Sequence, residues 1–390
     1  MSAQVGRAAK AANAANSAIA AKADAALITG ADGYLGLRLA SRYLETTAHP
    51  VFLWVRANGE SEIRSKQERL RTLLGRFRER VHLLFGDLGD AEPFAAVDPA
   101  GVRTILHAAA ATRFSIDQET ADRVNLGGTR KLLDFARRCP GLQRLGLLST
   151  LYVSGLTPGR IEEKPILERP VFANHYERSK WEAEAALLAE GDSLPWQIHR
   201  VATVIADDES GAVTQQNAFH NTLKLLYHGL LSLIPGKMDT PVYLVTGKFA
   251  ADAVVTLMSD GESRSVFHVA HSRLESLTLG ELMDVAFDTF ALDDGFRNRR
   301  ILRPLFADEE SFELLVAGVR AFGGGVVNQA VASVAPFAKQ LFVCKEIENR
   351  RLVAALRGYR APDARELAER VCNHLVRTRW GKEATLRAAG

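Results

Sequence analysis

The sequence has few cysteines and no strong excess of charge of either sign. Its three cysteines, Cys139, Cys344 and Cys372, are widely spaced among 390 residues, which excludes a disulfide framework and a cysteine-based zinc site. The 49 Lys and Arg residues nearly balance the 46 Asp and Glu residues, so the net charge is only +3. So small an excess argues against a protein that wraps nucleic acid. We therefore expect a protein of the reducing cytoplasm that binds no nucleic acid.

The sequence also lacks a long uninterrupted apolar segment. Residues 1–24 are rich in Ala, Asn and Ser and contain no apolar stretch of the length that a secretory signal requires, so they are predicted to be a low-complexity leader. The longest uncharged run, residues 321–338, includes three consecutive glycines and several polar residues, which makes it too polar for a transmembrane helix. A peripheral contact with a membrane stays open.

What is present is an alternation of short apolar runs and helical patterns. Hydrophobic residues make up 47% of the chain, enough for a large core. The alternation predicts an α/β fold, a Rossmann-type doubly wound parallel sheet covered by helices on both faces. The expected strands are residues 25–29, 51–55, 81–85, 102–106, 144–148 and 196–199, and the expected helices are residues 37–44, 61–80, 118–138 and 176–190.

The alternation loosens in the second half of the chain, where helical periodicity prevails. We expect an NADP-binding Rossmann domain at residues 25–205 and a mainly helical substrate-binding cap at residues 206–390, interleaved with it. The helices expected in the cap are residues 217–227, 279–290, 310–322 and 361–378. Isolated histidines such as His107, His220 and His228 lack the paired spacing of zinc ligands, so no metal site is expected.

A glycine-rich segment joins the first expected strand to the first expected helix. Gly30 allows a tight turn, Gly33 lets the backbone approach a pyrophosphate, and Gly36 permits close packing of the helix. The phosphates would then meet the free N–H groups of the helix N-terminus. The alternative is an ordinary turn between a strand and a helix. The expected cofactor-binding residues of this loop are Thr29, Gly30, Asp32, Gly33, Tyr34, Leu35 and Gly36.

Two side chains at the ends of the next strands bear on the choice of cofactor. Arg56 follows the second strand, where an NAD site would present a carboxylate to the ribose hydroxyls. A guanidinium there suits a 2′-phosphate and predicts NADPH, although an exposed arginine that merely ends a strand is the alternative. Asp87, after the third strand, could accept a hydrogen bond from the adenine amino group or could cap a turn.

A candidate catalytic set follows from helical spacing. Tyr176 and Lys180 are four residues apart, so on a helix both project from one face. An ammonium group near a phenol favours phenolate, which would lower the pKa of Tyr176 toward a range useful for proton transfer. Thr150 ends the fifth expected strand, where its hydroxyl could orient a substrate carbonyl.

Together these motifs resemble the extended short-chain dehydrogenase/reductase family. Thr29 to Gly36 matches the family's TGxxGxxG loop, Thr150 its catalytic Ser/Thr position, and Tyr176 with Lys180 its active-site pair. Asn125 matches the helix asparagine that supports the proton relay in this family, and is a catalytic residue by that resemblance. The resemblance covers residues 25 to about 205.

Three segments are similar to a narrower branch, the fatty acyl-CoA reductases (male sterility proteins) and the terminal reductase domains of carboxylic acid reductases and nonribosomal peptide synthetases. They are ILHAAAATRFS at 105–115, Ser149-Thr150-x-Tyr152-Val153, and YERSKWEAE at 176–184. The resemblance implies reduction of acyl thioesters by NADPH to aldehyde or alcohol, with an acyl-CoA or an acyl carrier protein as substrate. The further cofactor contacts that we expect are Leu88, His107, Ala108, Ala109 and Lys180.

Other functions of the same fold remain open. One is a 3β-hydroxysteroid-like or sugar-nucleotide dehydrogenase or epimerase, or a ketone reductase, and Arg56 argues against the enzymes of this group that use NAD. Another is an NADP-binding sensor without turnover, which would usually have lost Tyr176 or Lys180, whereas both are retained. The last 120 or so residues match no motif of the family.

Overall fold

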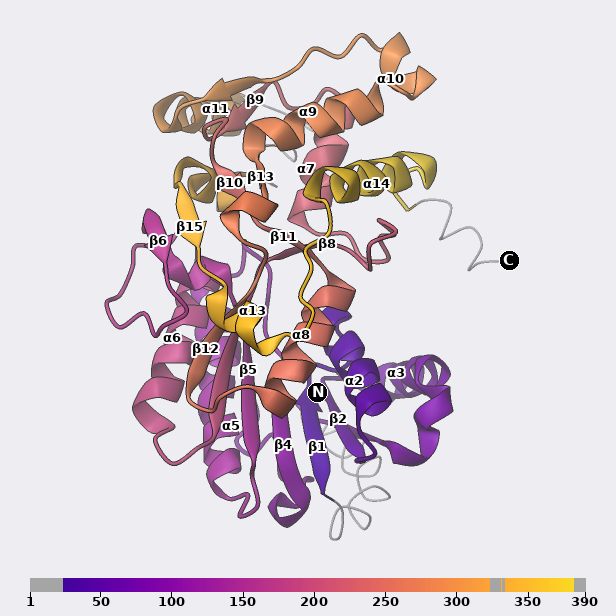
Figure 1. Ribbon diagram of the computed structural model, residues 1–390, viewed down its shortest axis with the longest axis vertical. Helices are drawn as coiled ribbons and strands as arrows, with labels where there is room; N and C mark the ends of the chain where they lie inside the picture. The colour runs from indigo at the N-terminus through magenta and orange to yellow at the C-terminus, as the bar shows by residue number, and fades with distance from the viewer. Residues whose placement is uncertain (1–23, 323–330, 332–333, 382–390) are drawn as a thin grey trace.

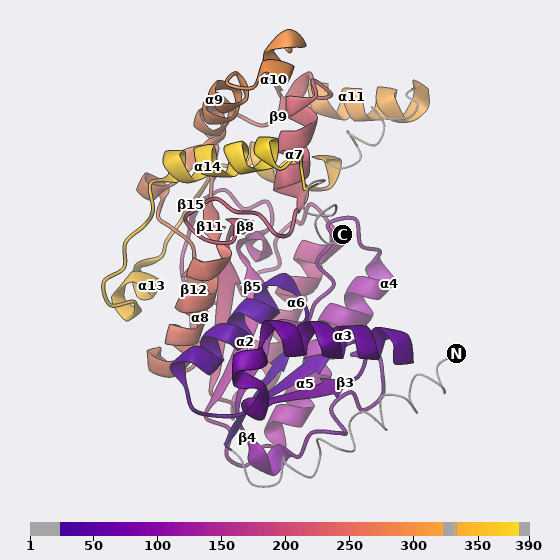
Figure 2. The same cartoon turned by 90° about the vertical axis from the view of Figure 1, so that its right-hand side faces the viewer.

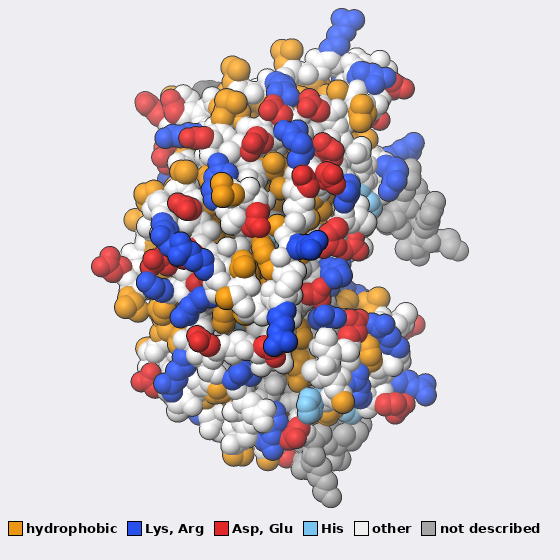
Figure 3. Space-filling view, viewed as in Figure 1, with side chains coloured by type: hydrophobic (Ala, Val, Ile, Leu, Met, Phe, Trp, Pro, Cys, Tyr) orange, Lys and Arg blue, Asp and Glu red, His pale blue; other side chains and the backbone are white. Residues whose placement is uncertain are grey.

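The computed structural model describes residues 24–322, 331 and 334–381. The leader expected at residues 1–24 thus lies outside the described residues except for Asp24. No helix in the described part of the chain is long and apolar enough to cross a bilayer. Figure 3 shows Lys and Arg side chains interspersed with Asp and Glu side chains over one face of the molecule.

A seven-stranded parallel sheet forms the lower part of the molecule (Figure 1), in the order β12-β7-β5-β4-β1-β2-β3. This confirms the predicted Rossmann-type α/β fold. The chain moves outward from β1 to β3 and then returns to place β4 beside β1, so a crevice opens at the carboxyl ends of β1 and β4. The strands of the sheet are β1 Ala25–Thr29, β2 Val51–Val55, β3 Val81–Phe85, β4 Val102–His107, β5 Arg144–Thr150, β7 Trp196–Val201 and β12 Ser265–Val269.

Both faces of the sheet are buried, which explains why its strands read as continuous apolar runs. Along β1, Ala26 and Ile28 belong to one core while Ala25 and Leu27 belong to the other, because successive side chains of a strand point to opposite faces. Helices on the two faces complete these cores (Figures 1 and 2). They are α2 Tyr34–Thr46, α3 Glu60–Leu73 and α8 Gly247–Asp260 on the first, and α5 Gly127–Arg137 and α6 His175–Glu190 on the second.

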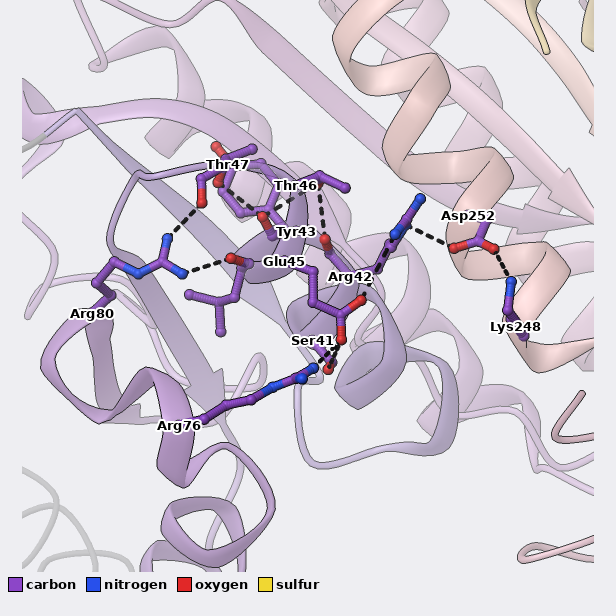
Figure 4. A network of polar contacts seen from close by, with 11 residues as sticks. Ser41, Arg42, Tyr43, Glu45, Thr46, Thr47, Arg76, Arg80, Lys248 and Asp252 are labelled. Carbon is purple, nitrogen blue, oxygen red and sulfur yellow. Dashed lines mark hydrogen bonds and ion pairs between the residues drawn. The ribbon is translucent and has the colours of Figure 1, made fainter. Parts of the chain in front are cut away.

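The second half of the chain contributes both α8 and β12 to this Rossmann unit. Strand β12 pairs with β7 and extends the sheet, and α8 packs beside α2. Figure 4 shows the polar part of that contact, where Asp252 forms an ion pair with Arg42 at 2.7 Å and accepts a hydrogen bond from Lys248 at 2.6 Å. The sequence pattern of the second half showed helical periodicity but did not single out the short apolar run of β12 as a strand.

The end of α2 is fixed by arginines from the segment that follows α3. Arg80 donates to the carbonyls of Leu44 and Thr47, both at 2.6 Å, and Arg76 pairs with Glu45 (Figure 4). The carbonyls of a last helical turn have no partner within the helix. These contacts therefore satisfy the C-terminus of α2, the helix whose N-terminus faces the glycine loop.

A cap of helices lies above the carboxyl ends of the strands (Figure 1). Its own core joins side chains from α7 Ala218–Tyr227, α9 Leu279–Phe290, α10 Asp294–Asn298, α11 Glu309–Phe322 and α14 Ala364–Arg377. The other strands form separate short pairs: β8 Thr203–Ala206 with β11 Leu244–Thr246, β9 Leu233–Pro235 with β14 Leu305–Ala307, β10 Pro241–Val242 with β13 Leu277–Thr278, and β6 Gly159–Ile161 with β15 Lys345–Ile347.

The remaining elements are short and lie mostly in the connections. They are η2 Gly75–Arg80, η3 Pro99–Gly101, α4 Gln118–Ala121, the π-helical turn η4 Asp122–Leu126, η5 Leu151–Ser154, η6 Arg273–Glu275, η7 Lys339–Phe342 and α13 Arg350–Ala355. Of these, η4, η5 and η7 adjoin the site described next.

Candidate active site

A single cavity of about 1080 Å³ runs from the glycine loop, along the carboxyl ends of the strands, into the core of the cap. It brings together residues that are far apart in the sequence. Of the predicted site residues it is lined by Gly30, Asp32, Gly33, Tyr34, Leu35, Gly36, Arg56, Asp87, Leu88, Ala108, Ala109, Thr150, Tyr176 and Lys180. Thr29, His107 and Asn125 do not line it.

The glycine loop has the tight geometry that its sequence predicts. Gly30 has a φ of 69°, in the left-handed region, and the N–H of Gly33 donates to the Gly30 carbonyl at 3.0 Å. A Cβ atom at Gly36 would lie only 2.0 Å from that carbonyl oxygen, so no larger residue fits. The loop thus holds the N-terminus of α2 open toward the cavity, where its N–H groups can meet phosphate oxygens.

Thr29 and His107 lie behind the cavity wall. The Thr29 hydroxyl is hydrogen-bonded to His107 Nδ1 at 2.7 Å and accepts from the N–H of Ala109 at 3.2 Å. Burial lowers the pKa of His107 to about 3, so its imidazole is neutral. The pair joins the ends of β1 and β4 and fixes the backbone of Ala108 and Ala109, which do line the cavity.

Tyr34 lines the cavity, but its phenol is engaged elsewhere. The hydroxyl lies 2.8 Å from the Asp207 carboxylate and 3.0 Å from the carbonyl of Ala206, and its one hydrogen is shared between these two acceptors. Arg38 lies over the Tyr34 ring and also pairs with Asp207 at 2.5 Å. Burial and the Asp207 carboxylate raise the pKa of Tyr34. The helix that follows the glycine loop is therefore anchored to the first residues of the cap.

Two cations lie at the outer end of the nucleotide half of the cavity. Arg56 is exposed and lines the cavity. Lys66 of α3 is partly buried and also lines the cavity, although the sequence predicted only the helix and did not single out this lysine. The Lys66 ammonium donates to the carbonyl of Arg56 at 2.5 Å and pairs with Asp32 and Glu62, both at 2.8 Å. Lys66 reaches the cavity because α3 packs against the sheet after β2. The helical periodicity of the sequence gives no sign of this position.

Asp87 and Leu88 form the neighbouring wall. The Asp87 carboxylate accepts from the N–H of Gly89 at 2.7 Å, which is the turn-capping role that the sequence left open. Asp87 also lines the cavity. Its carboxylate has further lone pairs, so capping this turn is compatible with accepting another hydrogen bond.

The expected catalytic residues converge at the middle of the cavity. Tyr176 and Lys180 lie on α6, and Thr150 ends β5 with its hydroxyl hydrogen-bonded to the Tyr176 phenol. The Lys180 ammonium donates to the carbonyl of Leu148 at 2.6 Å, and burial lowers its pKa to about 8. The i, i+4 spacing puts Tyr176 and Lys180 on one helix, and Thr150 meets them from the end of β5.

The electrostatics of Tyr176 differ from the sequence expectation. Burial raises the pKa of its phenol, although the hydrogen bond with Thr150 acts in the opposite direction. The lowering expected from Lys180 is not realised in this arrangement, because the partial burial of the phenol raises its pKa and the Lys180 ammonium is directed at the Leu148 carbonyl. The phenol is therefore a protonated hydrogen-bond donor at neutral pH.

Asn125 supports the site from behind. It lies in the π-helical turn η4, a kind of irregularity often found at functional sites. Its side chain accepts from the N–H of Ala111 at 2.8 Å and donates to the Ala111 carbonyl at 3.1 Å and to the Ser179 hydroxyl at 2.8 Å. Asn125 thus ties the loop after β4 to α6, next to Lys180.

An aromatic group surrounds Tyr176, and most of it was not recognised from the sequence. The Phe114 ring contacts the rings of Tyr176 at 5.6 Å, Tyr152 at 5.8 Å and Phe337 at 5.9 Å between centroids. Tyr152 hydrogen-bonds to Thr203 at 3.1 Å. The four rings come from four separate parts of the chain, so their proximity has no local sequence signal.

The cap half of the cavity is apolar. Its walls come from α7, α9 and the connections of the cap, and include Leu223, Leu226, Leu231, Ile234, Leu279, Leu282, Met283, Val334 and Leu341. No group of three or more His, Cys, Asp or Glu side chains among the described residues could hold a metal ion. The arrangement can hold a dinucleotide against one end, a polar reacting group at Tyr176, and a long apolar group at the other end.

Comparison with known proteins points to one family. The profile of the family described as male sterility protein matches residues 28–254. The chain is 26% identical over 265 residues to a polypeptide of the linear gramicidin synthase of Brevibacillus parabrevis, an alignment that covers 63% of this chain and 5% of that polypeptide. It is 28% identical over 169 residues to the probable fatty acyl-CoA reductase 5 of Arabidopsis thaliana, covering 36% of this chain and 33% of the relative.

A solved structure shares the whole fold. The terminal R domain from the myxalamid PKS-NRPS biosynthetic pathway superposes with a TM-score of 0.74 at 20% identity, covering 92% of each chain. The likeness therefore extends beyond the Rossmann sheet into the cap. The chain corresponds to a third or less of the length of the two relatives matched by sequence.

Proposed function

Because the chain belongs to the male sterility protein family, we propose that it is an NADPH-dependent reductase of acyl thioesters. The substrate would be an acyl-CoA or a carrier-bound acyl group, and the product an aldehyde or an alcohol. One observation carries the proposal: a single cavity joins the glycine loop, the Thr150–Tyr176–Lys180 group and an apolar chamber in the cap. A thioester with an apolar chain needs those three environments in that order.

The nucleotide half fits NADPH. Its phosphates would lie over the glycine loop, where the backbone approaches too closely for any Cβ at Gly36, and its 2′-phosphate would lie at Arg56. The Arg56 guanidinium favours a phosphate over a bare ribose diol, whereas the Lys66 ammonium is already paired with Asp32 and Glu62. When bound, NADPH supplies the hydride.

The protein's own residues handle the carbonyl oxygen. Tyr176 and Thr150 both present hydroxyl groups to the middle of the cavity, where they would donate hydrogen bonds to the thioester carbonyl and stabilise the oxyanion that develops. A proton from Tyr176 gives a hemithioacetal. Collapse of the hemithioacetal breaks the carbon–sulfur bond and yields a free thiol and an aldehyde, and a second reduction would give the alcohol.

The apolar chamber sets the expected preference for long chains. Each methylene that moves from water into it contributes ~0.8 kcal/mol, or about fourfold in specificity. Lengthening the acyl group from four to twelve carbons should therefore raise kcat/KM steeply until the chamber is filled. The residues of α7 and α9 would contact the chain.

The decisive experiment measures NADPH consumption and thiol release together, with acyl-CoA and carrier-bound acyl substrates of increasing length, and with steroid and UDP-sugar panels beside them. One thiol released for each aldehyde formed is the expected result. NADPH oxidation without thiol release would move the protein to the ketone-reducing enzymes of this fold. Turnover of a steroid or a sugar nucleotide alone would assign it there, and NADPH binding without turnover of any substrate would make it a sensor.

A further inference from the structure

A segment of the cap crosses the cavity beside the catalytic helix. We call residues 336–347 the strap; it includes η7 and β15 and ends by pairing with β6. Six of its residues line the cavity, namely Phe337, Gln340, Leu341, Val343, Lys345 and Ile347. The strap is therefore placed to contact an acyl group directly.

The strap is hydrogen-bonded to the first turn of α6, the turn that carries Tyr176. The N-cap residue Asn174 accepts from the N–H of Glu177 and donates to the carbonyl of Pro336, both at 3.0 Å. Glu177 is fully buried, and its carboxylate accepts from the Gln340 amide at 2.8 Å. The helix completes its own N-cap through Asn174, and the strap is bonded both to this capping residue and to Glu177.

Lys345 extends the same contact to the turn after Thr150. Its buried ammonium donates to the Gln340 side-chain oxygen at 2.7 Å, to the carbonyl of Gly155 at 2.5 Å and to the Ser154 hydroxyl at 3.0 Å. All three of its N–H groups are thus used. Gln340 therefore stands between a carboxylate on the Tyr176 helix and an ammonium held by the turn that follows Thr150.

Keeping these charges out of water has a cost. Burial raises the pKa of Glu177 to about 7 and lowers that of Lys345 to about 8, although each charge favours the other. Buried ionic groups contribute little net stability compared with well-packed apolar side chains, and in some proteins they specify a geometry instead. The direct ring contacts from Phe337 through Phe114 to Tyr176 lead to the same catalytic group.

We propose that Gln340, with Glu177 and Lys345, is a positioning network that makes the placement of Tyr176 and Thr150 depend on the strap's contact with the acyl chain. The proposal rests on the proposed function. Binding energy from the remote chain is then used to hold the reacting groups in place, so a long acyl group raises kcat as well as lowering KM. A misplacement of about 1 Å can cost on the order of 100-fold in rate.

The test is Gln340→Leu, which nearly keeps the volume of the side chain and removes its hydrogen bonds with Glu177, Lys345 and the Gly155 carbonyl. In the wild-type protein, kcat should be at least about tenfold higher with a twelve-carbon than with a four-carbon acyl thioester. In Gln340→Leu that difference in kcat should disappear, while KM for the long substrate and the Kd for NADPH stay within twofold. Gln143→Leu is the matched control, because the Gln143 side chain is exposed and lies outside both the cavity and the network.

Several outcomes would overturn the network. One is a wild-type kcat that does not vary with chain length, and another is an equal fall in kcat at both lengths, which a merely structural role would give. If Gln340→Leu does not fold, Gln340→Glu retains the acceptor for Lys345 and loses the donor to Glu177, and it should still lose the length dependence. Failure of the proposed function is distinct, since no acyl thioester would then release thiol in the wild-type protein.

Discussion

The two halves of the cavity are built in different ways. In the nucleotide half the wall is largely backbone: a Cβ atom at Gly30 would lie 2.7 Å from the Ala109 backbone, and one at Gly36 only 2.0 Å from the Gly30 carbonyl. In the cap half the wall consists of apolar side chains from separate elements, such as Leu226 of α7 and Met283 of α9. A backbone wall requires glycine at fixed positions, whereas a side-chain wall accepts many residues of suitable volume.

This difference explains why the nucleotide half of the cavity can be recognised in the sequence and the cap half cannot. Glycines with an obligatory spacing form a motif, and the motif at residues 29–36 was recognised. Apolar residues that line a chamber look like ordinary core residues, because in the cap they are core residues as well. Variants that damage one half and leave the other intact test the comparison.

The largest effect is expected at Tyr176, where the halves meet. Tyr176→Phe should lower kcat by about 100-fold to 1000-fold, the usual loss when one oxyanion donor is removed, and leave NADPH binding nearly unchanged. Tyr152→Phe is the matched control, since its ring also contacts Phe114 and its hydroxyl bonds to Thr203. Steady-state kinetics with a fluorescence titration of NADPH measure both quantities. Normal turnover in Tyr176→Phe would remove Tyr176 from the mechanism.

Gly36→Ala should break the nucleotide half selectively. The added methyl group collides with the Gly30 carbonyl, and relieving such a clash costs about 1–3 kcal/mol, which corresponds to about fivefold to 150-fold weaker NADPH binding. At Gly75 nothing lies within 4 Å of an added Cβ, so Gly75→Ala should bind NADPH normally. Isothermal titration calorimetry measures the NADPH affinity of the two variants. Equal affinities would show that the close backbone contact at Gly36 does not shape the nucleotide site.

Arg56→Asp should change the choice of nucleotide without affecting the acyl chamber. The variant removes a donor to the 2′-phosphate and adds a repelling carboxylate, so the ratio of kcat/KM for NADPH over NADH should fall by about tenfold. Arg64→Asp alters an exposed arginine of α3 outside the cavity and serves as the control. An unchanged ratio would show that Lys66 or another group holds the phosphate, and Lys66→Met would then be the next variant.

The smallest effect is expected from a single wall residue of the cap. Phe219 of α7 lines the cavity and is partly exposed, so Phe219→Ala should lower kcat/KM for a twelve-carbon thioester by roughly threefold to tenfold and leave a four-carbon substrate and NADPH unaffected. Leu274→Ala, at a side chain that is 97% exposed and outside the cavity, should change neither substrate. A loss shared by both chain lengths would place the acyl group elsewhere.

The site was predicted from the sequence wherever chemistry depends on local spacing. The Tyr176–Lys180 pair lies on one helical face because the residues are four apart, and the glycine loop precedes a helix that it leaves open at the N-terminus. Lys66 and Gln340 line the same cavity but carry no such spacing. The direction of the pKa shift of Tyr176 also could not be predicted, since it depends on burial by Phe114 and its neighbours.

By itself the sequence determined the Rossmann-type sheet, the nucleotide loop and the family, because alternating apolar runs, obligatory glycines and i, i+4 pairs are local patterns. Only the tertiary structure decided that α8 and β12 return to the sheet, that the strap reaches the catalytic helix, and that Tyr176 is desolvated. Each of these depends on contacts between segments far apart in the chain. Such contacts are fixed by the packing of whole elements against one another, which no short window of residues specifies.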